Sequence, residues 1–413
     1  MSVIISLSPN TQKQDVFLAL KLIFQPHHWQ KGRAIQKLEN WFKKYLKVST
    51  AVSFDSGRSA LLAILKSLNL KSKDEVLLQS FTCVAVPNSI LWANLRPIFV
   101  DIDETLNLGP EDLEKKITPK SKAVIIQHTF GYPSQIEKIK KICQEHNLIL
   151  IEDCAHGLGA QYQGKKIGTF SDASFFSFGR DKVVSSVFGG LAVTNDQKIG
   201  KNLKRFQKNL KFPDKKFILQ NLLHPILFLL ILPIYYFFNL GKFLLVLFQR
   251  LNLLNFPVDP CEKKGQKPQN IPRKLPNAMA HLALGQLERL DQFVNHRIKI
   301  ASIYQKNLQD LKNLKIISPR PGCRTTFLRY PILVDNPEAK RKKFHSRFKT
   351  LIGNWYRPLI APAGVDLNLI GYQKGFCPKA EEASKKILNL PTNLHCLPKQ
   401  AKQIAQNLTK LII

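Results

Sequence analysis

Acidic residues are scarce in this sequence. Against 62 Lys and Arg there are only 29 Asp and Glu, which leaves a formal net charge of +33. Such a balance favours anionic partners: nucleic acid, an acidic membrane surface or a phosphorylated substrate. Because lysine is abundant along the whole chain, coding bias explains most of the excess, and local basic clusters are more informative. No nucleic-acid recognition motif accompanies the charge, so we expect no nucleic-acid partner.

Cysteine pairs are missing as well. The seven cysteines are odd in number and contain no CxxC pair, which argues against a disulfide framework and against a zinc site. We therefore expect no metal centre, and the cysteine usage fits a reducing cytosol. The opening stretch "MSVIISLSPNTQKQDVF" has no basic region followed by a long apolar run, so it does not resemble a signal peptide.

Short apolar runs alternate with amphipathic stretches in the first half of the chain. This alternation predicts a mostly parallel sheet covered by helices on both faces. Ligands of such sheets bind at the carboxyl ends of the strands, so the polar residues there are the candidates for function. The expected strands are 51–54, 75–81, 96–103, 123–130, 148–154, 173–179 and 190–195.

The first of these strand ends carries a candidate anion site. The stretch "DSGRSALLAIL" opens a helix with small residues, and we expect free backbone N–H groups at Gly57 and Ser59. A helix N-terminus attracts phosphate, and the guanidinium of Arg58 adds further donors. An ordinary serine N-cap has the same pattern, so both interpretations stay open for this motif alone.

Three further strand ends carry polar side chains. "LILIEDCAHG" places Asp153 after the most apolar run, where a carboxylate needs a partner. It either caps the next helix or balances a buried cation, with His156 as a hydrogen-bonding neighbour. "FFSFGRDK" places Ser177 and Lys182 on either side of a turn, although a lysine there is most often a surface residue. "SFTCVAVPNS", with Cys83, ends a strand beside them.

Taken together, these groups require a ligand with a phosphate, a cationic centre and a carbonyl that an amine can attack. Pyridoxal 5′-phosphate has all three. A lysine forms a Schiff base with its aldehyde, and an aspartate keeps the pyridine nitrogen protonated so that the ring accepts electrons. We therefore expect pyridoxal phosphate as the cofactor.

In their order along nearly the whole chain, these motifs resemble those of the DegT/DnrJ/EryC1/StrS sugar aminotransferases, members of the fold-type I pyridoxal-phosphate superfamily. The longest resembling stretch begins at "IIQHTFGYP" and continues through "LILIEDCAHGLGAQYQGKKIGTFSDASFFSFGRDK". The other resembling stretches are "SGRSAL", "SFTCVAVPNSI", "RPIFVDID", "WYRPL" and "LIGYQKGFCPKAEEASKKILNLP".

The resemblance implies a role for each candidate residue. Lys182 would be the Schiff-base lysine and the proton shuttle, Asp153 would pair with the pyridine nitrogen, and His156 would contact the ring hydroxyl. The implied reaction transfers an amino group, usually from glutamate, to a keto sugar on a nucleotide carrier, here for envelope glycans. The full set of implied cofactor-binding residues is Gly57, Arg58, Ser59, Cys83, Asp153, His156, Ser177 and Lys182.

Four positions depart from the family pattern. Arg58 replaces a threonine of the phosphate turn, and Cys83 replaces the aromatic residue expected to stack on the ring. Phe188 replaces an acid after the lysine. Pro272 stands where an asparagine reaches the neighbouring subunit's phosphate. We hypothesise that Arg58 supplies the phosphate donors that are lost elsewhere.

The segment from about 206 to 270 has no counterpart in the family pattern. Its stretch Phe217–Gly241 lacks charged residues, and a second apolar piece after Lys242 is interrupted by Arg250. One crossing would separate the two halves of the fold, and a mid-bilayer arginine costs about 2.5–3.5 kcal/mol. With basic flanks on both sides, a shallow re-entrant hairpin or interfacial helices at 217–256 is the favoured prediction. A buried helical pair or a dimer contact is the alternative.

The resemblance implies an α/β fold-type I aminotransferase, with a large domain that contains a mostly parallel sheet and a smaller C-terminal α+β domain. The apolar run adds an expected helical insertion to this fold. The resemblance also implies a homodimer. We expect the protein on the cytoplasmic side of the inner membrane or in the cytoplasm. Two alternative functions remain open. One is a pyridoxal-phosphate enzyme that acts on a lipid-linked or other carbonyl substrate, and the other is a non-catalytic cofactor-binding regulator. The expected units are an arm at 1–30, the large domain at 31–205 and 271–300, the insertion at 206–270 and the small domain at 301–413.

Overall fold

The computed structural model describes residues 5, 10–235, 237–348 and 350–412. Residues 1–4 and 6–9 of the expected N-terminal arm lie outside the described residues, as do residues 236, 349 and 413.

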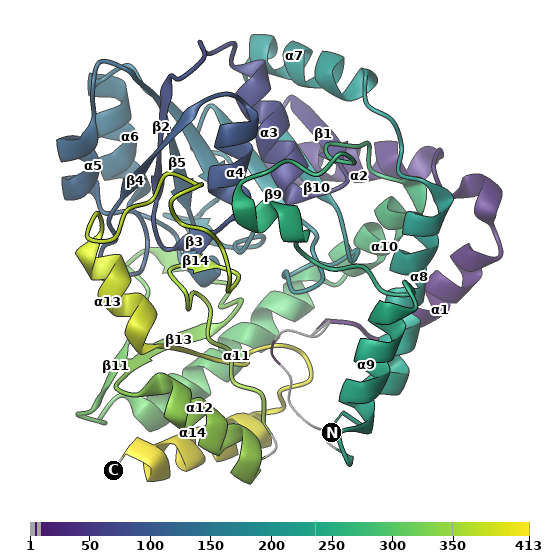
Figure 1. The fold of residues 1–413 in the computed structure, drawn as a ribbon, viewed down its shortest axis with the longest axis vertical. Coiled ribbons are helices and arrows are strands. Elements are labelled where there is room, and N and C mark those ends of the chain that lie inside the picture. Colours follow the sequence, from purple (N-terminus) through teal and green to yellow (C-terminus); the bar gives the residue numbers. More distant parts are fainter. Residues whose placement is uncertain (1–4, 6–9, 236, 349, 413) are drawn as a thin grey trace.

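A seven-stranded sheet forms the centre of the large domain (Figure 1). Its strands follow the order β1-β10-β9-β6-β5-β2-β4, and the pairs β9–β6, β6–β5, β5–β2 and β2–β4 are parallel. The expected mostly parallel sheet is thus confirmed. The strand bounds are Thr50–Phe54 (β1), Glu75–Gln79 (β2), Arg96–Val100 (β4), Ser121–Gln127 (β5), Ile149–Asp153 (β6), Ala173–Ser177 (β9) and Gly190–Thr194 (β10).

Only β10 runs against the other strands of this sheet. It is antiparallel to both β1 and β9, so β1 points the same way as β9 and as the parallel strands beyond it. The carboxyl ends of β1, β6 and β9 therefore lie at one edge of the sheet, and the candidate residues follow those ends.

Helices cover both faces of the sheet because its strands are apolar on both sides. In β5, Val124 and Ile126 join one core cluster, while Ala123 and Ile125 join the other. The alternation follows from the two-residue period of a strand. The first cluster includes side chains of α2 (Arg33–Leu46), α6 (Ile136–Glu145) and α10 (Asn277–Leu287). The second includes side chains of α3 (Gly57–Ser67), α4 (Ala85–Trp92) and α7 (Gln197–Lys208).

The C-terminal part forms a second layer around a small antiparallel sheet. Strands β11 (Leu314–Ile316), β13 (Tyr330–Val334) and β15 (Ile387–Leu390) pair in the order β11-β13-β15. A separate core cluster joins this sheet to α11 (Leu290–Leu308), α12 (Pro337–Phe348) and α14 (Pro398–Ile412). The expected domain boundaries stay a prediction.

Two short strand pairs join the C-terminal part to the large domain. β14 (Ile360–Ala361) pairs in parallel with β3 (Thr82–Cys83), and β12 (Cys323–Arg324) pairs with β7 (Gln161–Tyr162), which also pairs with β8 (Lys165–Lys166). The loop before β14 is thereby held near the carboxyl edge of the large sheet. Helices α5 (Pro110–Lys116) and α13 (Pro378–Lys386) complete the regular structure here.

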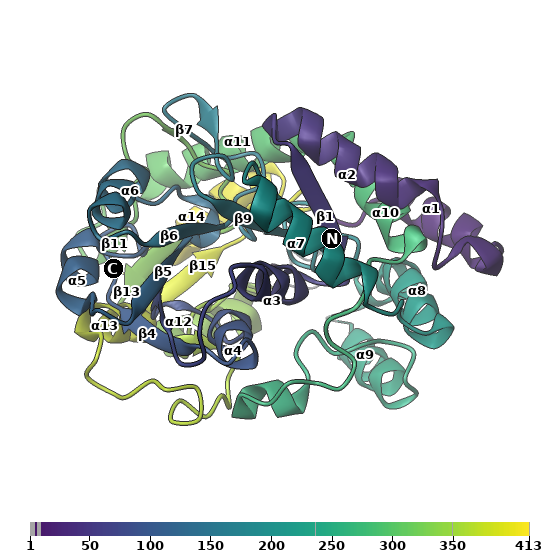
Figure 2. The ribbon, with the colours of Figure 1, turned by 90° about the horizontal axis from the view of Figure 1, so that it is seen from above.

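The apolar segment contains two helices, of which α8 lies beside the N-terminal helix and α9 lies beside α8 (Figures 1 and 2). Helix α8 (Lys215–Ile231) continues through Pro225 and places Ile218 and Leu222 in the main core. It contacts α1 (Lys13–Ile23) and α9 (Leu240–Arg250). Among the described residues, none of the helices combines the length and the apolar character that a membrane crossing requires.

Candidate active site

The phosphate-turn motif forms the start of α3, directly after β1. Ser56 is the N-cap, and its hydroxyl oxygen accepts a hydrogen bond from the backbone N–H of Ser59 at 3.3 Å. An added Cβ on Gly57 would lie 2.8 Å from the Cβ of Ser177, so glycine permits the close approach of the β1 and β9 ends. The serine N-cap interpretation is therefore confirmed, and Gly57, Ser59 and Ser177 are also brought together at one helix N-terminus.

Arg58 points away from this helix terminus. Its Nη1 forms an ion pair with the buried carboxylate of Glu262, and its Nη2 donates to the carbonyl oxygen of Pro257 at 2.6 Å. Both terminal nitrogens thus hold the segment that follows α9. The hypothesis that Arg58 supplies phosphate donors stays a prediction, and it requires this guanidinium to exchange partners.

Replacing Arg58 tests both roles. Arg58→Thr leaves an oxygen of Glu262 buried without its cation, so we expect a loss of about 3 kcal/mol in the free energy of unfolding. Chemical denaturation measures it, and adding Glu262→Gln should restore part of the loss. Arg96→Thr is the control, because Arg96 is 64% exposed in its pair with Glu75, and exposed pairs contribute at most about 1 kcal/mol. An unchanged cofactor affinity in Arg58→Thr would remove Arg58 from the phosphate site.

Asp153 ends β6 as a buried carboxylate with one oxygen available. Its Oδ1 accepts from the backbone N–H of Ala155 at 2.9 Å, and within the described residues Oδ2 has no hydrogen-bond donor. Burial raises the pKa of Asp153 to about 6, although Lys182 and His128 act to lower it. A buried acid of this kind is stabilised by a cation placed against its open oxygen.

His156 belongs to a stack of rings beside Asp153. Its Nδ1 accepts from the backbone N–H of Phe130 at 3.2 Å, so the proton lies on Nε2, which is 3.4 Å from the hydroxyl oxygen of Tyr356. The ring is parallel to that of Phe130 at 5.9 Å and also lies 5.9 Å from the ring of Trp355. Burial and the charge of Lys182 lower the pKa of His156 well below its usual value, so the imidazole is neutral.

Lys182 follows β9 on a short loop and lies between an acid and an aromatic ring. Its Nζ is 3.7 Å from Oδ1 of Asp181 and 5.0 Å from the ring centre of Trp355. Asn10 holds the loop by donating to the carbonyl oxygens of Lys182 and Val183. The side chain of Lys182 is only 14% exposed, so it is not an ordinary surface lysine.

Cys83 reaches the same place from the short strand β3. Burial raises the pKa of its thiol, although the charges of Lys182 and Arg58 act in the opposite direction. The thiol is therefore protonated and close to both cations, where it offers a ring a smaller contact surface than an aromatic side chain.

The other two departures contact the apolar segment and the turn after β1. The ring of Phe188 lies 5.4 Å from that of Phe217 in α8. Pro272 precedes Arg273, whose backbone N–H donates to Oδ1 of Asp55 at 3.3 Å. Both positions thus join the region of α8 to the active-site edge.

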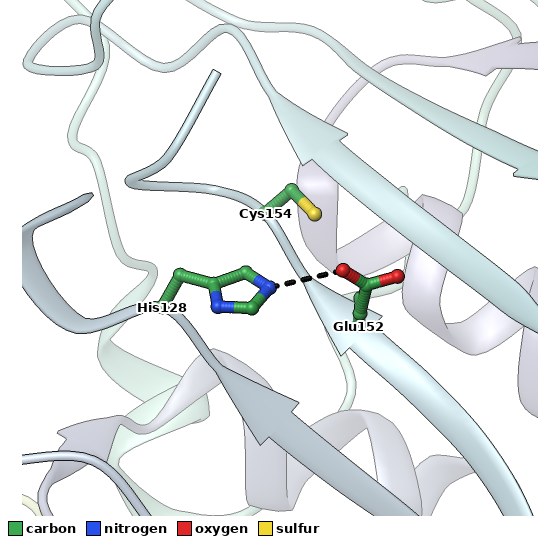
Figure 3. A group of neighbouring side chains, drawn as sticks. All are labelled: His128, Glu152 and Cys154. Atoms are coloured by element: carbon green, nitrogen blue, oxygen red, sulfur yellow. Dashed lines mark hydrogen bonds and ion pairs between the residues drawn. The ribbon is translucent and has the colours of Figure 1, made fainter. Parts of the chain in front are cut away.

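A second cluster of potential ligands lies behind Asp153, and Figure 3 shows its three side chains. The ligand atoms of His128, Glu152 and Cys154 lie within 4.8 Å of one another, and all three residues are buried. His128 Nδ1 accepts from the backbone N–H of Ser134, which leaves the proton on Nε2 to donate to Glu152 at 3.1 Å. Glu152 also accepts from the backbone N–H of Gly168 at 2.7 Å. These hydrogen bonds tie β6 to the neighbouring loops, so the cluster has a structural role that needs no metal ion.

Three neighbours of Lys182 were not singled out from the sequence: Asp181, Arg329 and Trp355. Nη2 of Arg329 donates to Oδ2 of Asp181 at 3.2 Å, and its guanidinium carbon lies 4.0 Å from the ring centre of Trp355. Asp181 directly precedes Lys182 in the sequence, and this position could have identified it as a site residue. Arg329 and Trp355 come from the C-terminal part, and no local pattern marks them.

The described residues fit a phosphorylated aldehyde with a cationic ring. Gly57 lets Ser177 lie against the N-terminus of α3, because an added Cβ at Gly57 would lie 2.8 Å from the Cβ of Ser177. Asp153 offers a carboxylate oxygen without a hydrogen-bond donor among the described residues, and the amine of Lys182 is near enough for its charge to act on this carboxyl group. The roles of the individual residues stay predictions.

Comparison with known proteins agrees with this fit. The relative GDP-perosamine synthase of Escherichia coli O157:H7 is 29% identical over 364 residues, which are 88% of this chain and 85% of that protein. The solved structure of Helicobacter pylori PseC, an aminotransferase involved in the biosynthesis of pseudoaminic acid, gives a TM-score of 0.78 at 22% identity and covers 100% of this chain and 99% of that one.

A further structure, NtdA from Bacillus subtilis with bound cofactor PMP, gives a TM-score of 0.74 at 20% identity, covering 100% of this chain and 86% of that one. The sequence model of the DegT/DnrJ/EryC1/StrS aminotransferase family matches residues 10–217 and 262–409. The unmatched stretch contains most of α8 and all of α9. This chain belongs to the DegT/DnrJ/EryC1/StrS aminotransferase family and is thus a pyridoxal-phosphate-dependent transaminase.

Proposed function

We propose that this chain transfers an amino group from an amino acid, expected to be L-glutamate, to a keto sugar carried on a nucleotide. The observation that carries the proposal is the placement of the largely buried Lys182 and Asp153 at the carboxyl edge of the sheet, where the charge of Lys182 acts on Asp153. The relative named GDP-perosamine synthase supports a nucleotide sugar as the acceptor. Synthesis of envelope glycans is the proposed use of the product.

The cofactor, when bound, supplies an electrophilic carbon for amines and a ring that accepts electrons. Lys182 would bond to that carbon through Nζ and, once released, would carry a proton on the same nitrogen. Asp153 would stabilise a positive charge at the ring nitrogen. Gly57, Ser59 and Ser177 would hold the phosphate at the N-terminus of α3, while His156 and Cys83 would line the ring.

The visible spectrum tests this function. Purified protein with pyridoxal phosphate should show the absorbance band of lysine-bound cofactor, and L-glutamate should convert it to the amino form. Keto-sugar nucleotides are then screened for the one that restores the band. A band that glutamate never converts would instead support a cofactor-binding regulator. Conversion without any acceptance of nucleotide sugars would point to a lipid-linked or other carbonyl substrate.

We also propose a homodimer, as the family resemblance implies. The orientation of Asp55 toward the backbone of Arg273 keeps the stretch around Pro272 at the active-site edge. In the family pattern this stretch reaches a neighbouring subunit. Light scattering of the cofactor-loaded protein checks the mass, and a monomer that retains full turnover would contradict the proposal.

The α8–α9 region carries a proposed contact with the cytoplasmic surface of the inner membrane. Phe217–Phe256 contains no acidic residues, and Phe237, Phe238 and Phe243 are 60%, 89% and 62% exposed. Lysines at the starts of α1 and α8 are exposed, and such lysines next to apolar side chains suit a surface of anionic lipids.

Vesicle flotation tests this contact. We expect the protein to float with phosphatidylglycerol vesicles more than with phosphatidylcholine vesicles, and less so in high salt. The pair Phe238→Ser and Phe243→Ser should lower binding about tenfold or more, because each loses a buried aromatic contact of about 1.5–3 kcal/mol. Phe376→Ser is the control, since Phe376 is 47% exposed elsewhere. Wild-type protein that does not float with either kind of vesicle would contradict membrane binding. So would a double variant that still floats like the wild-type protein but no longer forms a dimer.

A further inference from the structure

A groove follows the outer edge of the large sheet, and we call it the edge groove. Strand β4 is the last strand in the sheet order, so among the described residues one of its sides has no neighbouring strand (Figure 1). Along this side, β4 and the loop 368–376 line a cavity of about 670 Å³. Small-molecule sites have volumes of about 300–1,000 Å³. The described residues that line the edge groove include none of the candidate cofactor-binding residues.

The edge groove is lined by four cations and by no acid among the described residues. Three of these cations lie at the amino ends of neighbouring strands. Lys73 lies two residues before β2, Arg96 begins β4, and Lys120 directly precedes β5. The backbone N–H of Lys73 donates to the carbonyl oxygen of Asn94 at 2.8 Å, and that of Glu75 donates to the carbonyl oxygen of Lys120 at 2.9 Å. The start of the sheet therefore holds these cations together, at the edge opposite to the candidate active site.

Two of the four cations have no partner within the described residues. Arg96 and Lys116 each pair with a carboxylate, at 3.4 Å and 2.9 Å. Lys73 and Lys120 are exposed, and neither side chain forms an ion pair or a hydrogen bond in this part of the chain. Unbalanced positive charge of this kind attracts phosphate groups.

A second cavity, of about 570 Å³, shows that lysines alone do not produce such an imbalance. Its lining includes four lysines, and four acids accompany them. The lysines are Lys312, Lys315, Lys379 and Lys386, and the acids are Asp103, Glu104, Asp335 and Glu382. The excess of positive charge is therefore a property of the edge groove and does not follow from the composition of the chain alone.

The rest of the edge groove is largely apolar, and its two walls are tied together. Leu369 and Phe376 of the loop are 55% and 47% exposed. Nζ of Lys116 donates to the carbonyl oxygen of Phe99 in β4 at 2.8 Å and to that of Phe376 at 3.0 Å. Pro97 in β4 has no backbone N–H, so this edge is a poor template for an added strand. A small molecule therefore suits the edge groove better than an extended peptide.

Two side-chain amides distinguish between classes of small anion. Asn368 and Gln373 line the same cavity as Phe376. An amide both donates and accepts hydrogen bonds, which suits the polar edge of a nucleobase, and an exposed aromatic ring provides a stacking surface for its face. An acyl chain would use neither amide. A nucleoside phosphate matches the amides, the aromatic ring and the unbalanced cations together.

We propose that the edge groove is a binding site for a nucleoside phosphate. Lys73, Arg96 and Lys120 hold the phosphate groups, and the base lies against Leu369 and Phe376. The site is separate from the candidate active site, so this inference does not depend on the proposed transaminase function.

Photolabelling of the cofactor-loaded protein tests this inference. The probe is ADP with a photoreactive azide on the adenine, and peptide mapping should find the label within residues 366–377. Unlabelled ADP should prevent labelling, and adenosine should do so at least about tenfold less well because it lacks the charged groups. Lys73→Gln combined with Lys120→Gln should weaken the protection by ADP about tenfold or more. Leu369→Asp should weaken it as well, since it places a negative charge on the apolar wall.

The matched control is Lys312→Gln combined with Lys315→Gln in the second cavity, which removes the same charge from exposed lysines. This variant should be labelled like the wild-type protein. Equal losses in the two double variants would overturn the inference, because they would show unspecific attraction of ADP to a basic surface.

Two results with the wild-type protein would also overturn the inference, whatever the variants do. One is label confined to the peptides that contain Lys182 or the start of α3, because ADP would then bind only at the candidate active site. The other is protection by dodecyl phosphate as strong as that by ADP, which would show that the edge groove takes an acyl chain in place of a nucleoside.

Discussion

Lys182→Ala should abolish turnover, with a loss of at least about 1,000-fold, because the variant lacks both the covalent link to the cofactor and the proton carrier. The visible band of lysine-bound cofactor should disappear, and borohydride reduction should leave no cofactor on the peptide that contains position 182. Lys182 Nζ lies near Asp181, Trp355 and Asp153, so no neighbouring amine among the described residues replaces it.

The control for this variant is Lys198→Ala on the exposed surface of α7. It should retain the band and the turnover of the wild-type protein. Addition of a small primary amine should restore part of the activity of Lys182→Ala if the lysine acts as a proton carrier. A Lys182→Ala protein that still carries reducible cofactor on the same peptide would contradict the assignment.

Asp153→Asn should have the second largest effect, with turnover lowered on the order of 100-fold or more. The amide has the shape of the acid but no charge, so it cannot keep a positive charge at the ring nitrogen. Because Oδ1 of Asp153 is held by Ala155 N–H, the asparagine should keep the local backbone conformation. Asp172→Asn serves as the comparison, since Asp172 accepts from Leu150 N–H at the other end of β6. Equal turnover in Asp153→Asn and wild type would refute the pairing.

The pH dependence of cofactor affinity follows from the same carboxyl group. Its pKa is raised to about 6 in the folded protein, so the group is charged above that pH and neutral below it. A neutral carboxyl cannot pair with a cationic ring, so affinity should fall by up to about tenfold per pH unit below 6. The stability of the cofactor-free protein should depend on pH in the opposite direction. The raised pKa of Asp153 increases the free energy of unfolding at low pH, and this contribution is lost as the pH rises through 6. Asp153→Asn should flatten both curves.

The sequence predicted the parts of the site that follow long, buried strands. The apolar runs before Asp153 and Ser177 gave β6 and β9 with nearly the expected ends, and the small residues at Gly57 marked the turn after β1. In these cases a local periodicity places a polar residue at the sheet edge, because the strand direction fixes where its end lies.

The remaining site residues come from contacts that no local pattern encodes. Trp355 lies in the loop before β14, which pairs with β3. Arg329 follows Leu328, whose backbone N–H donates to the carbonyl oxygen of Phe130. The partner of Arg58 was likewise not predicted, because Glu262 lies far along the chain from Arg58 and no local pattern links the two residues. The apolar character of residues 217–256 favoured a shallow hairpin or interfacial helices over a buried helical pair, yet Ile218 and Leu222 of α8 are core residues.

The end of the α8–α9 segment limits how the chain can be shortened. Nη2 of Arg180, two residues before Lys182, donates to the carbonyl oxygen of Asn255 at 2.8 Å, and Arg58 donates to that of Pro257. A truncation that removes these two carbonyl groups would leave Nη2 of Arg180 and Nη2 of Arg58 without these acceptors, close to Lys182. Loss of activity after such a cut would therefore say nothing about lipids, whereas single changes on the outer side of α9 leave both anchors intact.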